Sequence, residues 1–274
     1  MILVSGATGN VDGELVRQLI ADGTSVRALT RDPARAALPA GVEVAAGDFG
    51  TPESLRAAFS GVRALFLMRS GHEAAVLYEA ARAGVRRVVL LSSIAVQTRP
   101  DSLIGRSHRD AEEACQRSGL EWTILRPGQF ASNTRGWRAQ VLAGDVVRTP
   151  YARVALPAVH PGDVAAVARV ALTGPAGAGV IYPLSGPRAV TPVEQVAAIG
   201  RAIGRPLRHE EIGVEQAGRE MAAFMPAEIV AATLAFLGTP TAAETEVSST
   251  VEAVTGKPAR TFEEWAYDNV GAFR

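Results

Sequence analysis

The chain is poor in lysine and cysteine and has no excess of charge of either sign. Its 274 residues include 28 Lys and Arg, 28 Asp and Glu, and a single lysine, Lys257. A phosphate-binding loop of the GxxxxGK type is therefore excluded, and a Schiff-base lysine is excluded at every position except 257. Balanced charge without a basic run also argues against nucleic acid as a partner.

Other absences restrict the compartment and the chemistry. Cys115 is the only cysteine, so neither an internal disulfide nor a cysteine-based zinc cluster can form. No apolar run reaches the roughly 18 to 20 residues that span a bilayer, and no basic segment precedes the apolar start at residues 2–4. We therefore expect a cytoplasmic protein without a membrane partner. The histidines show no metal-ligand spacing, so no metal site is predicted.

Short apolar runs alternate with helical patterns through the first half of the chain. The runs are rich in Val, Ile and Leu, as expected for strands buried on both faces of a parallel sheet. They cover residues 2–4, 25–29, 42–45, 64–68, 88–91 and 123–125, and apolar positions at helical spacing occur at 14–22, 52–59, 72–83 and 106–117. Repeated strand–helix units predict an α/β fold with a doubly wound parallel sheet of the Rossmann-like type.

The pattern changes after about residue 150. A helix at 163–172 and a strand at 180–184 are predicted to return to the sheet. Beyond Gly186 the chain is mainly helical, with helices predicted at 192–204, 214–224, 227–237, 242–255 and 262–273. We expect residues 1–150 to form the sheet domain and residues 185–274 to form a smaller lobe. Such a lobe lies beside the carboxyl ends of the strands, where ligands bind.

A glycine-rich turn joins the first strand to the first helix, and it reads Ser5-Gly6-Ala7-Thr8-Gly9-Asn10-Val11. Glycines at positions 6 and 9 permit a tight turn and close approach of backbone N–H groups to a pyrophosphate, and the helix N-terminus adds a partial positive charge. The turn also opens a series of strand–helix units. It therefore predicts that residues 1–150 bind a dinucleotide, NAD(P).

Position 12 departs from the motif, because Asp12 replaces the third glycine expected there. This position shares a helical face with the apolar residues Leu15, Val16 and Leu19. Two orientations stay open. The carboxylate either faces the pyrophosphate, which it repels by roughly 2–3 kcal/mol at ~6 Å, or it tilts outward and stabilises the helix N-terminus by about 0.3–1 kcal/mol.

The end of the second strand indicates which dinucleotide is bound. A ribose-binding carboxylate is expected there, but the strand ends in Thr30-Arg31 and the first carboxylate is Asp32. Arg31, assisted by Arg35, is placed to pair with a 2′-phosphate. NADP(H) is therefore predicted in preference to NAD(H), which stays possible. Asp48, after the third strand, is expected to accept a hydrogen bond from the adenine amino group.

These features resemble the atypical short-chain dehydrogenase/reductases, and in particular the NmrA-like group that includes quinone oxidoreductase 2-type proteins. The resemblance covers nearly the whole chain through GATGNV at 6–11, TRDPAR at 30–35, GDF at 47–49, LLSS at 90–93, SGLEWTILRPGQF at 118–130, HPGDVA at 160–165 and TGKPARTFEEWA at 255–266. It implies a substrate cleft beneath the C-terminal lobe. It also implies cofactor contacts from the loops that follow the strands, namely Gly6, Thr8, Gly9, Asn10, Val11, Arg31, Asp48, Phe49, Met68, Arg69, Pro127 and Gly128.

The proton donor is not apparent. Most of the wider superfamily uses Tyr-x-x-x-Lys, in which the lysine lowers the pKa of the tyrosine, but no tyrosine here precedes a lysine at that spacing. At the matching helix, His108 replaces the tyrosine and Glu112 the lysine. His108 is a catalytic candidate if Glu112 holds it charged; the alternative is a surface pair of little consequence. Ser93 is a second catalytic candidate, and Ser92 a cofactor contact.

Three functions are consistent with these residues. The first is an NADPH-dependent reductase of a quinone, a polycyclic aromatic ketone or another conjugated carbonyl, of the kind that tailors bacterial natural products, with Phe130, Asn133 and Trp137 lining its substrate cleft. A conjugated acceptor spreads the charge left by hydride transfer, so a weak proton donor suffices. The second is a non-catalytic dinucleotide sensor. The third is an isomerase or another enzyme that recycles its bound dinucleotide.

Overall fold

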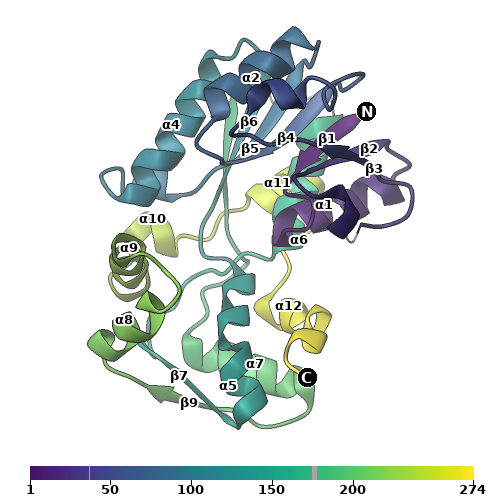
Figure 1. Ribbon diagram of the computed structural model, residues 1–274. Helices are drawn as coiled ribbons and strands as arrows, with labels where there is room; N and C mark the ends of the chain where they lie inside the picture. The colour runs from purple at the N-terminus through teal and green to yellow at the C-terminus, as the bar shows by residue number, and fades with distance from the viewer. Residues whose placement is uncertain (37, 175–177) are drawn as a thin grey trace.

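In the computed structural model, seven parallel strands form one sheet in the order β3-β2-β1-β4-β5-β6-β8 (Figure 1). The structure describes residues 1–36, 38–174 and 178–274, and the side chain of Arg35 also lies outside the described part. The strands are β1 (Ile2–Ser5), β2 (Val26–Thr30), β3 (Glu43–Ala46), β4 (Ala64–Met68), β5 (Arg87–Leu91), β6 (Glu121–Pro127) and β8 (Val180–Leu184). The chain order reverses at β1, which creates a crevice beyond the carboxyl ends of β1 and β4. The predicted Rossmann-like α/β fold is confirmed.

Helices cover both faces of this sheet. One layer consists of α1 (Asn10–Ala21), α6 (Pro161–Thr173) and α11 (Thr250–Thr255), and the other of the 3₁₀ helix η2 (Pro52–Leu55) with α2 (Glu73–Arg82) and α4 (Leu103–Arg117). Leu15, Val16 and Leu19 of α1 are fully buried in the first layer, and Leu77 and Cys115 are buried in the second. The strands read as unbroken apolar runs because side chains are buried on both sides of the sheet.

A second, smaller part lies below the sheet in Figure 1. It contains α5 (Arg138–Ala143), α7 (Pro192–Ile203), α8 (Val214–Ala222), α9 (Ala227–Gly238), α12 (Phe262–Asp268), β7 (Val146–Thr149) and β9 (Arg208–Glu211). The Trp265 ring lies 5.4 Å from that of Phe262 and 6.1 Å from that of Phe273, and all three are buried. The remaining short helices are η1 (Pro33–Arg35), α3 (Ala95–Thr98), η3 (Ala131–Trp137), α10 (Ala242–Thr245) and η4 (Val270–Ala272).

The pairing of β7 with β9 was not predicted. These two strands run parallel, from Val146 opposite Arg208 to Thr149 opposite Glu211. Both have only four residues, and β9 (RHEE) is polar and mostly exposed, so neither is long enough to show the apolar run or the alternation by which strands are recognised. The pairing also places α5 and β7 with the lower part, although they fall within the range 1–150 that the sequence assigns to the sheet domain.

Two predicted helices are wrong in extent. Segment 52–59 is helical only over η2, and the chain continues in turns, in which the Ser60 N–H donates to the Ala57 carbonyl at 3.2 Å. The Arg27 guanidinium binds the carbonyl oxygens of Ala58 and Ser60 at 2.6 and 2.7 Å at the end of these turns. Segment 242–255 is two short helices, α10 and α11. Between them Ser248 donates its backbone N–H to Ser185 and its hydroxyl to the Pro183 carbonyl, so the segment docks on the end of β8 instead of continuing as a helix.

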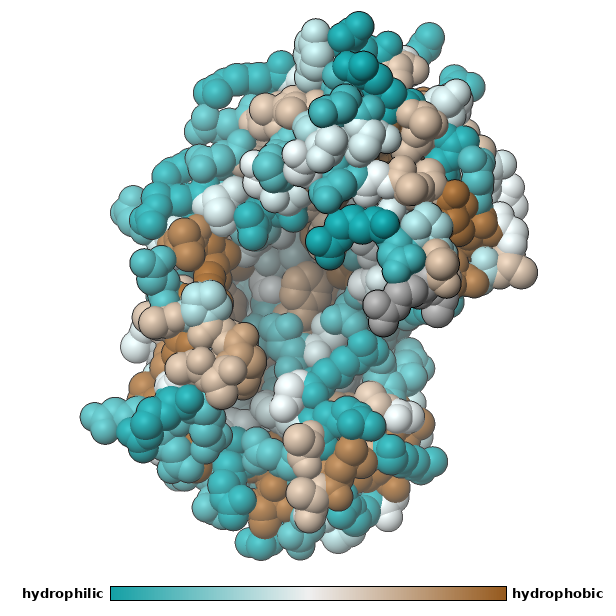
Figure 2. Space-filling model, in the orientation of Figure 1, coloured by the Kyte–Doolittle hydropathy of each residue, from teal (hydrophilic) through white to brown (hydrophobic). Residues whose placement is uncertain are grey.

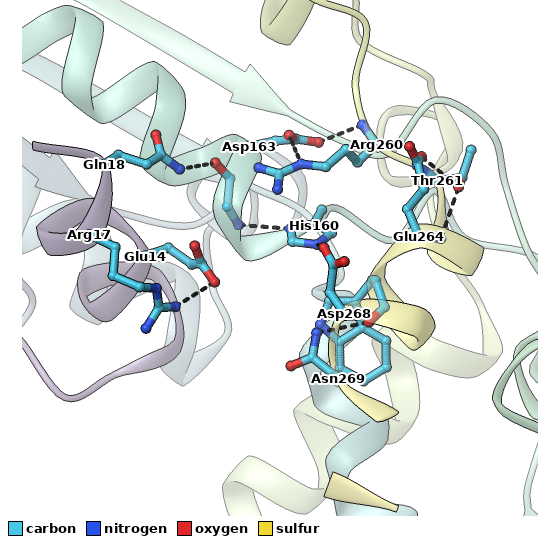
Figure 3. A network of polar contacts seen from close by, with 12 residues as sticks. Glu14, Arg17, Gln18, His160, Asp163, Arg260, Thr261, Glu264, Asp268 and Asn269 are labelled. Atoms are coloured by element: carbon cyan, nitrogen blue, oxygen red, sulfur yellow. Dashed lines mark hydrogen bonds and ion pairs between the residues drawn. The ribbon is translucent and has the colours of Figure 1, made fainter. Parts of the chain in front are cut away.

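A buried polar network joins the two parts of the molecule (Figure 3). Asp163 of α6 accepts hydrogen bonds from the backbone N–H and the Nε of Arg260, at 2.7 and 2.8 Å. His160 caps α6 by accepting from the Gly162 N–H, and Gln18 of α1 donates to the Gly162 carbonyl. The helix that follows the glycine turn is therefore tied through α6 to the segment that leads into α12. Among the described residues, no helix is long and apolar enough to cross a membrane.

Candidate active site

The glycine turn has the close geometry that the sequence predicts. Gly6 has φ +66°, and a Cβ there would lie 3.1 Å from the sulfur of Met68. The Gly9 N–H donates to the Gly6 carbonyl at 2.7 Å, which closes the turn, and Gly9 is the N-cap of α1. With no side chain on either glycine, the N-terminus of α1 and its free N–H groups face the crevice at the switch point. This arrangement is an anion-binding cradle.

Asp12 lies inward, beneath this turn. It is 2% exposed, and a Cβ added to Gly9 would lie 2.5 Å from its Oδ2. Its Oδ1 has no hydrogen-bond partner among the described residues. Burial raises the pKa of Asp12 to about 7, against a smaller opposite effect of the backbone hydrogen bond at Asp12 itself. The outward orientation is therefore wrong, and an acid that is half ionised near neutral pH lies directly behind the cradle.

A cavity of 500 Å³, here called the loop cavity, opens on one side of the turn. Predicted cofactor residues that line it are Gly6, Thr8, Arg31, Asp48, Phe49, Met68 and Arg69. Leu29, Leu38, Ser70 and His72 also line it and were not predicted. Gly9, Asn10 and Val11 are not in its wall, because they form the N-cap and first turn of α1. The predicted residues come together because each follows a neighbouring strand, so all lie at one edge of the sheet.

The residues expected to select the dinucleotide differ in how well they are placed. Arg31 is exposed at the end of β2, on the wall of the loop cavity. Arg35 belongs to η1, but its side chain lies outside the described part. Asp48 accepts the Gly50 N–H on Oδ1 at 2.9 Å, which fixes its carboxylate at the cavity wall.

Arg135 of η3 connects the turn to the lower part. Its guanidinium donates to the side-chain oxygen of Asn10, the first residue of α1, and at 2.6 Å to that of Asn269, just after α12. This contact was not predicted, since the three residues are far apart in the chain. It places one cation of the lower part at the edge of the cradle.

A second cavity, here called the cleft cavity, has a volume of 400 Å³ and lies between the two parts of the molecule. Figure 2 shows the molecule deeply hollowed there, with apolar side chains along the wall near α8 and α9. The cavity brings together the predicted residues Met68, Arg69, Ser92, Ser93, His108, Pro127, Gly128, Phe130 and Asn133. Trp137 is not among its lining residues. Arg99, Ile104, Ala232, Thr233 and Phe236 line it without having been predicted.

Glu112 does not hold His108 charged, contrary to the sequence expectation. Its carboxylate instead accepts from Arg126 at 2.9 and 2.6 Å and from the Ser92 hydroxyl at 2.5 Å. Glu112 and Ser92 are 3% and 4% exposed, so this cluster is a buried support for the end of β5 and β6. The proton of the Ser92 hydroxyl is engaged within the protein, which leaves Ser92 a poor donor to any ligand.

His108 is neutral near pH 7. Burial, together with the positive charge of Arg69, lowers its pKa to about 4, against smaller raising effects of Glu112 and Glu73. Its Nδ1 is buried without a hydrogen-bond partner among the described residues, while the side chain as a whole is half-buried and reaches the cleft cavity. A neutral imidazole can donate or accept one hydrogen bond, but it is not the imidazolium acid that the sequence suggested.

Ser93 faces the same cavity, but its hydroxyl proton, unlike that of Ser92, is available to a ligand. Its oxygen accepts the Ala95 N–H at 3.2 Å, and no hydrogen bond donated by its hydroxyl is found among the described residues. Unlike Ser92, it therefore has a proton to offer a ligand. The cleft cavity thus presents the Ser93 hydroxyl and the neutral imidazole of His108, and the Thr233 hydroxyl and the guanidinium groups of Arg69 and Arg99 lie in the same wall.

A glycine turn at the switch point of a parallel sheet, with a cavity beside it, is typical of a Rossmann-like nucleotide-binding protein. The chain belongs to the NAD(P)H-binding family, whose sequence profile matches residues 6–175. The NmrA-like group that the sequence resembles has the same fold: the structure of NmrA, a negative transcriptional regulator, superimposes with a TM-score of 0.75 at 18% identity, covering 98% of this chain and 95% of that one.

Individual relatives extend over the whole chain. A (4-alkanoyl-5-oxo-2,5-dihydrofuran-3-yl)methyl phosphate reductase of Streptomyces griseus is 42% identical over 281 residues, which cover 100% of this chain and 99% of the relative. An NAD(P)H azoreductase of Xenophilus azovorans is 35% identical over 283 residues, with coverage of 100% and 99%. The structure of an NADPH-dependent quinone oxidoreductase of Escherichia coli superimposes with a TM-score of 0.83 at 24% identity, covering 98% of this chain and 99% of that one. These relatives are NAD(P)H-dependent reductases or reductases by name, which supports an NAD(P)H-dependent oxidoreductase.

Proposed function

We propose that the protein is an NADPH-dependent reductase of a small molecule whose carbonyl group is conjugated with a double bond, a quinone ring or an aromatic system. The observation that carries this proposal is that two cavities meet at the end of β4. The loop cavity and the cleft cavity share Met68 and Arg69, and the glycine turn lines the loop cavity. A dinucleotide whose phosphates lie at the turn would extend past Met68 and Arg69 and place its nicotinamide end beside Ser93 and His108.

The residues present fit such a cofactor. The backbone of Gly6 and Gly9, where no side chain fits, and the N-terminus of α1 would hold the pyrophosphate. Arg31 would pair with the 2′-phosphate, which favours NADP(H), while Asp48 and Phe49 would contact the adenine. When bound, the cofactor supplies a hydride from its nicotinamide ring.

In the cleft cavity the chain orients the acceptor and stabilises the charge that develops on it. The free hydroxyl of Ser93 donates a hydrogen bond to the carbonyl oxygen, and the neutral imidazole of His108 holds the substrate from the facing helix. Leu91, Phe130 and Phe236 exclude water from the same space. No strong acid is required, because a conjugated acceptor distributes negative charge over its own oxygen atoms.

The Streptomyces griseus relative supports a conjugated acceptor. Its name describes a ring double bond attached to both a lactone carbonyl and an alkanoyl carbonyl. Hydride addition to the far carbon of such a bond leaves an enolate shared between two carbonyls, which is stable without a dedicated proton donor. We therefore propose this enone-like class first, and quinones second. Both suit a tailoring step in bacterial natural-product formation.

Steady-state oxidation of NADPH tests the proposal, with a panel of 4-alkanoyl-2,5-dihydrofuran-5-ones, quinones and polycyclic aromatic ketones as acceptors. We expect turnover with conjugated acceptors and none with saturated ketones of the same size. Tight NADPH binding without turnover of any acceptor would favour a dinucleotide sensor. Conversion of substrate without net loss of NADPH would favour an isomerase that recycles its cofactor.

A further inference from the structure

A third cavity, here called the lobe cavity, continues from the cleft cavity into the lower part. Its volume is 380 Å³, and it shares Gln129, Asn133 and Thr233 with the cleft cavity. Beyond these residues its wall is mainly apolar, formed by Trp137, Ile212, Met221, Phe224, Met225 and Leu237. The two cavities thus form one site with a polar reacting end and an apolar far end.

Helix α9 separates and lines both cavities. Apart from Glu228 in its first turn and Thr233, its residues are apolar or glycine, yet Val230 is its only buried residue. A helix of this composition is normally enclosed by protein. Here Phe236 faces the cleft cavity and Leu237 faces the lobe cavity, so much of its apolar surface borders open space. An apolar surface retained in this position is explained by a ligand that covers it.

The side chains of the lobe cavity suit a flexible hydrocarbon. Met221 and Met225 have unbranched, polarizable side chains that adjust to an irregular occupant. Phe224 is 70% exposed at the end of α8, so an aromatic ring lies at the rim with no protein cover. The polar residues Arg148 and Glu220 also line the cavity, and Arg148 is ion-paired with Glu210 at 3.1 Å.

We propose that the lobe cavity binds an aliphatic chain carried by the substrate, while the conjugated carbonyl to which the chain is attached lies in the cleft cavity. This assignment rests on the proposed function for the identity of the head group. The continuity of the two cavities through Gln129, Asn133 and Thr233 gives the chain its path. Trp137, predicted to line a substrate cleft, then contacts the chain rather than the reacting group.

Binding of 2-alkyl-1,4-naphthoquinones to the protein saturated with NADP⁺ tests this proposal without any turnover. Isothermal titration of a series from methyl to decyl should give a Kd that falls about twofold to fourfold for each added methylene until the cavity is full. A Kd independent of chain length would overturn the proposal. Length-dependent binding in a protein that reduces no acceptor would overturn the proposed function and leave the chain site standing.

A matched pair of variants locates the effect. Leu237→Trp fills the lobe cavity and should weaken binding of the decyl compound at least tenfold relative to the methyl compound. Leu142→Trp makes the same change at a 45% exposed position of α5 outside the cavity wall, and should leave that ratio within twofold. An equal ratio in both variants would overturn the proposal. The NADP⁺ Kd of each variant reports whether it is folded.

A second substitution covers the case in which Leu237→Trp does not fold. Met221→Glu places a charge on the half-buried wall of the lobe cavity and should abolish the gain in affinity with chain length. The alternative is that a second copy of the chain covers the apolar wall. Sedimentation will then show a dimer that Met221→Glu dissociates, and the Kd of the naphthoquinones will not depend on chain length. That result would overturn the proposal.

Discussion

The loop cavity and the cleft cavity adjoin each other, but they are built in opposite ways. The loop cavity consists of backbone and of residues that directly follow β1 to β4, so local sequence determines it. The cleft cavity consists of side chains from β5, α4, α9 and the segment after β6, and a buried ion pair supports it. Under the proposed function, recognition of the dinucleotide is thus a local property of the chain, whereas recognition of the acceptor depends on tertiary packing.

The largest effect should come from breaking the support of the cleft cavity. Glu112→Gln leaves Arg126 without its carboxylate partner, in a pair whose side chains are 4% and 15% exposed. We expect a loss of roughly 3–5 kcal/mol in the free energy of unfolding, measured by urea denaturation. Glu113→Gln on the same helix removes only the exposed pair with Arg117, and should cost less than about 0.5 kcal/mol. Similar losses in both variants would contradict a supporting role for the buried cluster.

The next effect concerns the acid beneath the turn. Because the pKa of Asp12 is raised to about 7, its carboxyl is mostly protonated at pH 6 and mostly ionised at pH 8, where it repels the pyrophosphate. The Kd for NADPH should therefore rise roughly tenfold from pH 6 to pH 8. Asp12→Asn should remove this dependence, and Asp12→Gly should bind NADPH more tightly than the natural chain at pH 8. A pH-independent Kd in the unmodified protein would refute the repulsion.

Asp12 also links pH to stability. Its pKa is higher in the folded chain than the ordinary value of 3.8, so unfolding releases a proton between the two values. The folded state is therefore increasingly disfavoured as pH rises from about 4 to 7, and the loss is complete above 7. Asp12→Asn should be more stable than the unmodified protein at pH 8 and nearly equal to it at pH 4, which thermal unfolding at the two pH values will show.

A third substitution tests the selection of the dinucleotide at the loop cavity. Arg31→Gln should weaken NADPH binding by about tenfold to a hundredfold, since one hydrogen-bonded charge on the 2′-phosphate is lost. The Kd for NADH should not change, because that cofactor lacks the phosphate. Arg86→Gln, at an exposed position before β5 and so at the opposite edge of the sheet, serves as the control. Equal weakening of NADPH binding and NADH binding would show that Arg31 attracts both cofactors by its charge and does not recognise the 2′-phosphate.

The smallest expected effect is that His108 does not titrate near neutral pH. With a pKa of about 4, its imidazole should not titrate between pH 5.5 and 8, and its NMR signals should stay constant over that range. At saturating NADPH, kcat should vary by less than about twofold from pH 6 to 8. A fall in kcat with a midpoint near 6.5 that disappears in His108→Asn would instead show that His108 acts as a charged acid.

The contrast between the cavities also explains what the sequence could predict. Gly6, Thr8 and Arg31 follow buried strands directly, and parallel strands bring such residues to one edge of the sheet, so strand order and motif spacing suffice. Even there, the direction of Asp12 could not be predicted, because a polar residue at the start of a helix can face inward or outward at similar cost. Only the packing of α1 on the sheet decides it.

The residues of the cleft cavity were harder to predict from the sequence. Glu112 lies one helical turn from His108, so local spacing suggested that these two would pair, but β6 brings Arg126 to the same carboxylate. Nothing in the sequence marks Phe236 or Thr233 as site residues. The one available clue was the stretch of α9, which is apolar except for Glu228 and Thr233 and is too short to span a membrane.

Met68 and Arg69 belong to both cavities, and this shared wall has a consequence for directed evolution. A substitution at either position changes the environment of the dinucleotide and of the acceptor at once, so selection for a new acceptor there also alters cofactor saturation. Libraries confined to α9 and to the end of α8 separate the two traits, because those segments line only the acceptor side. Acceptor scope can then be varied at constant affinity for NADPH.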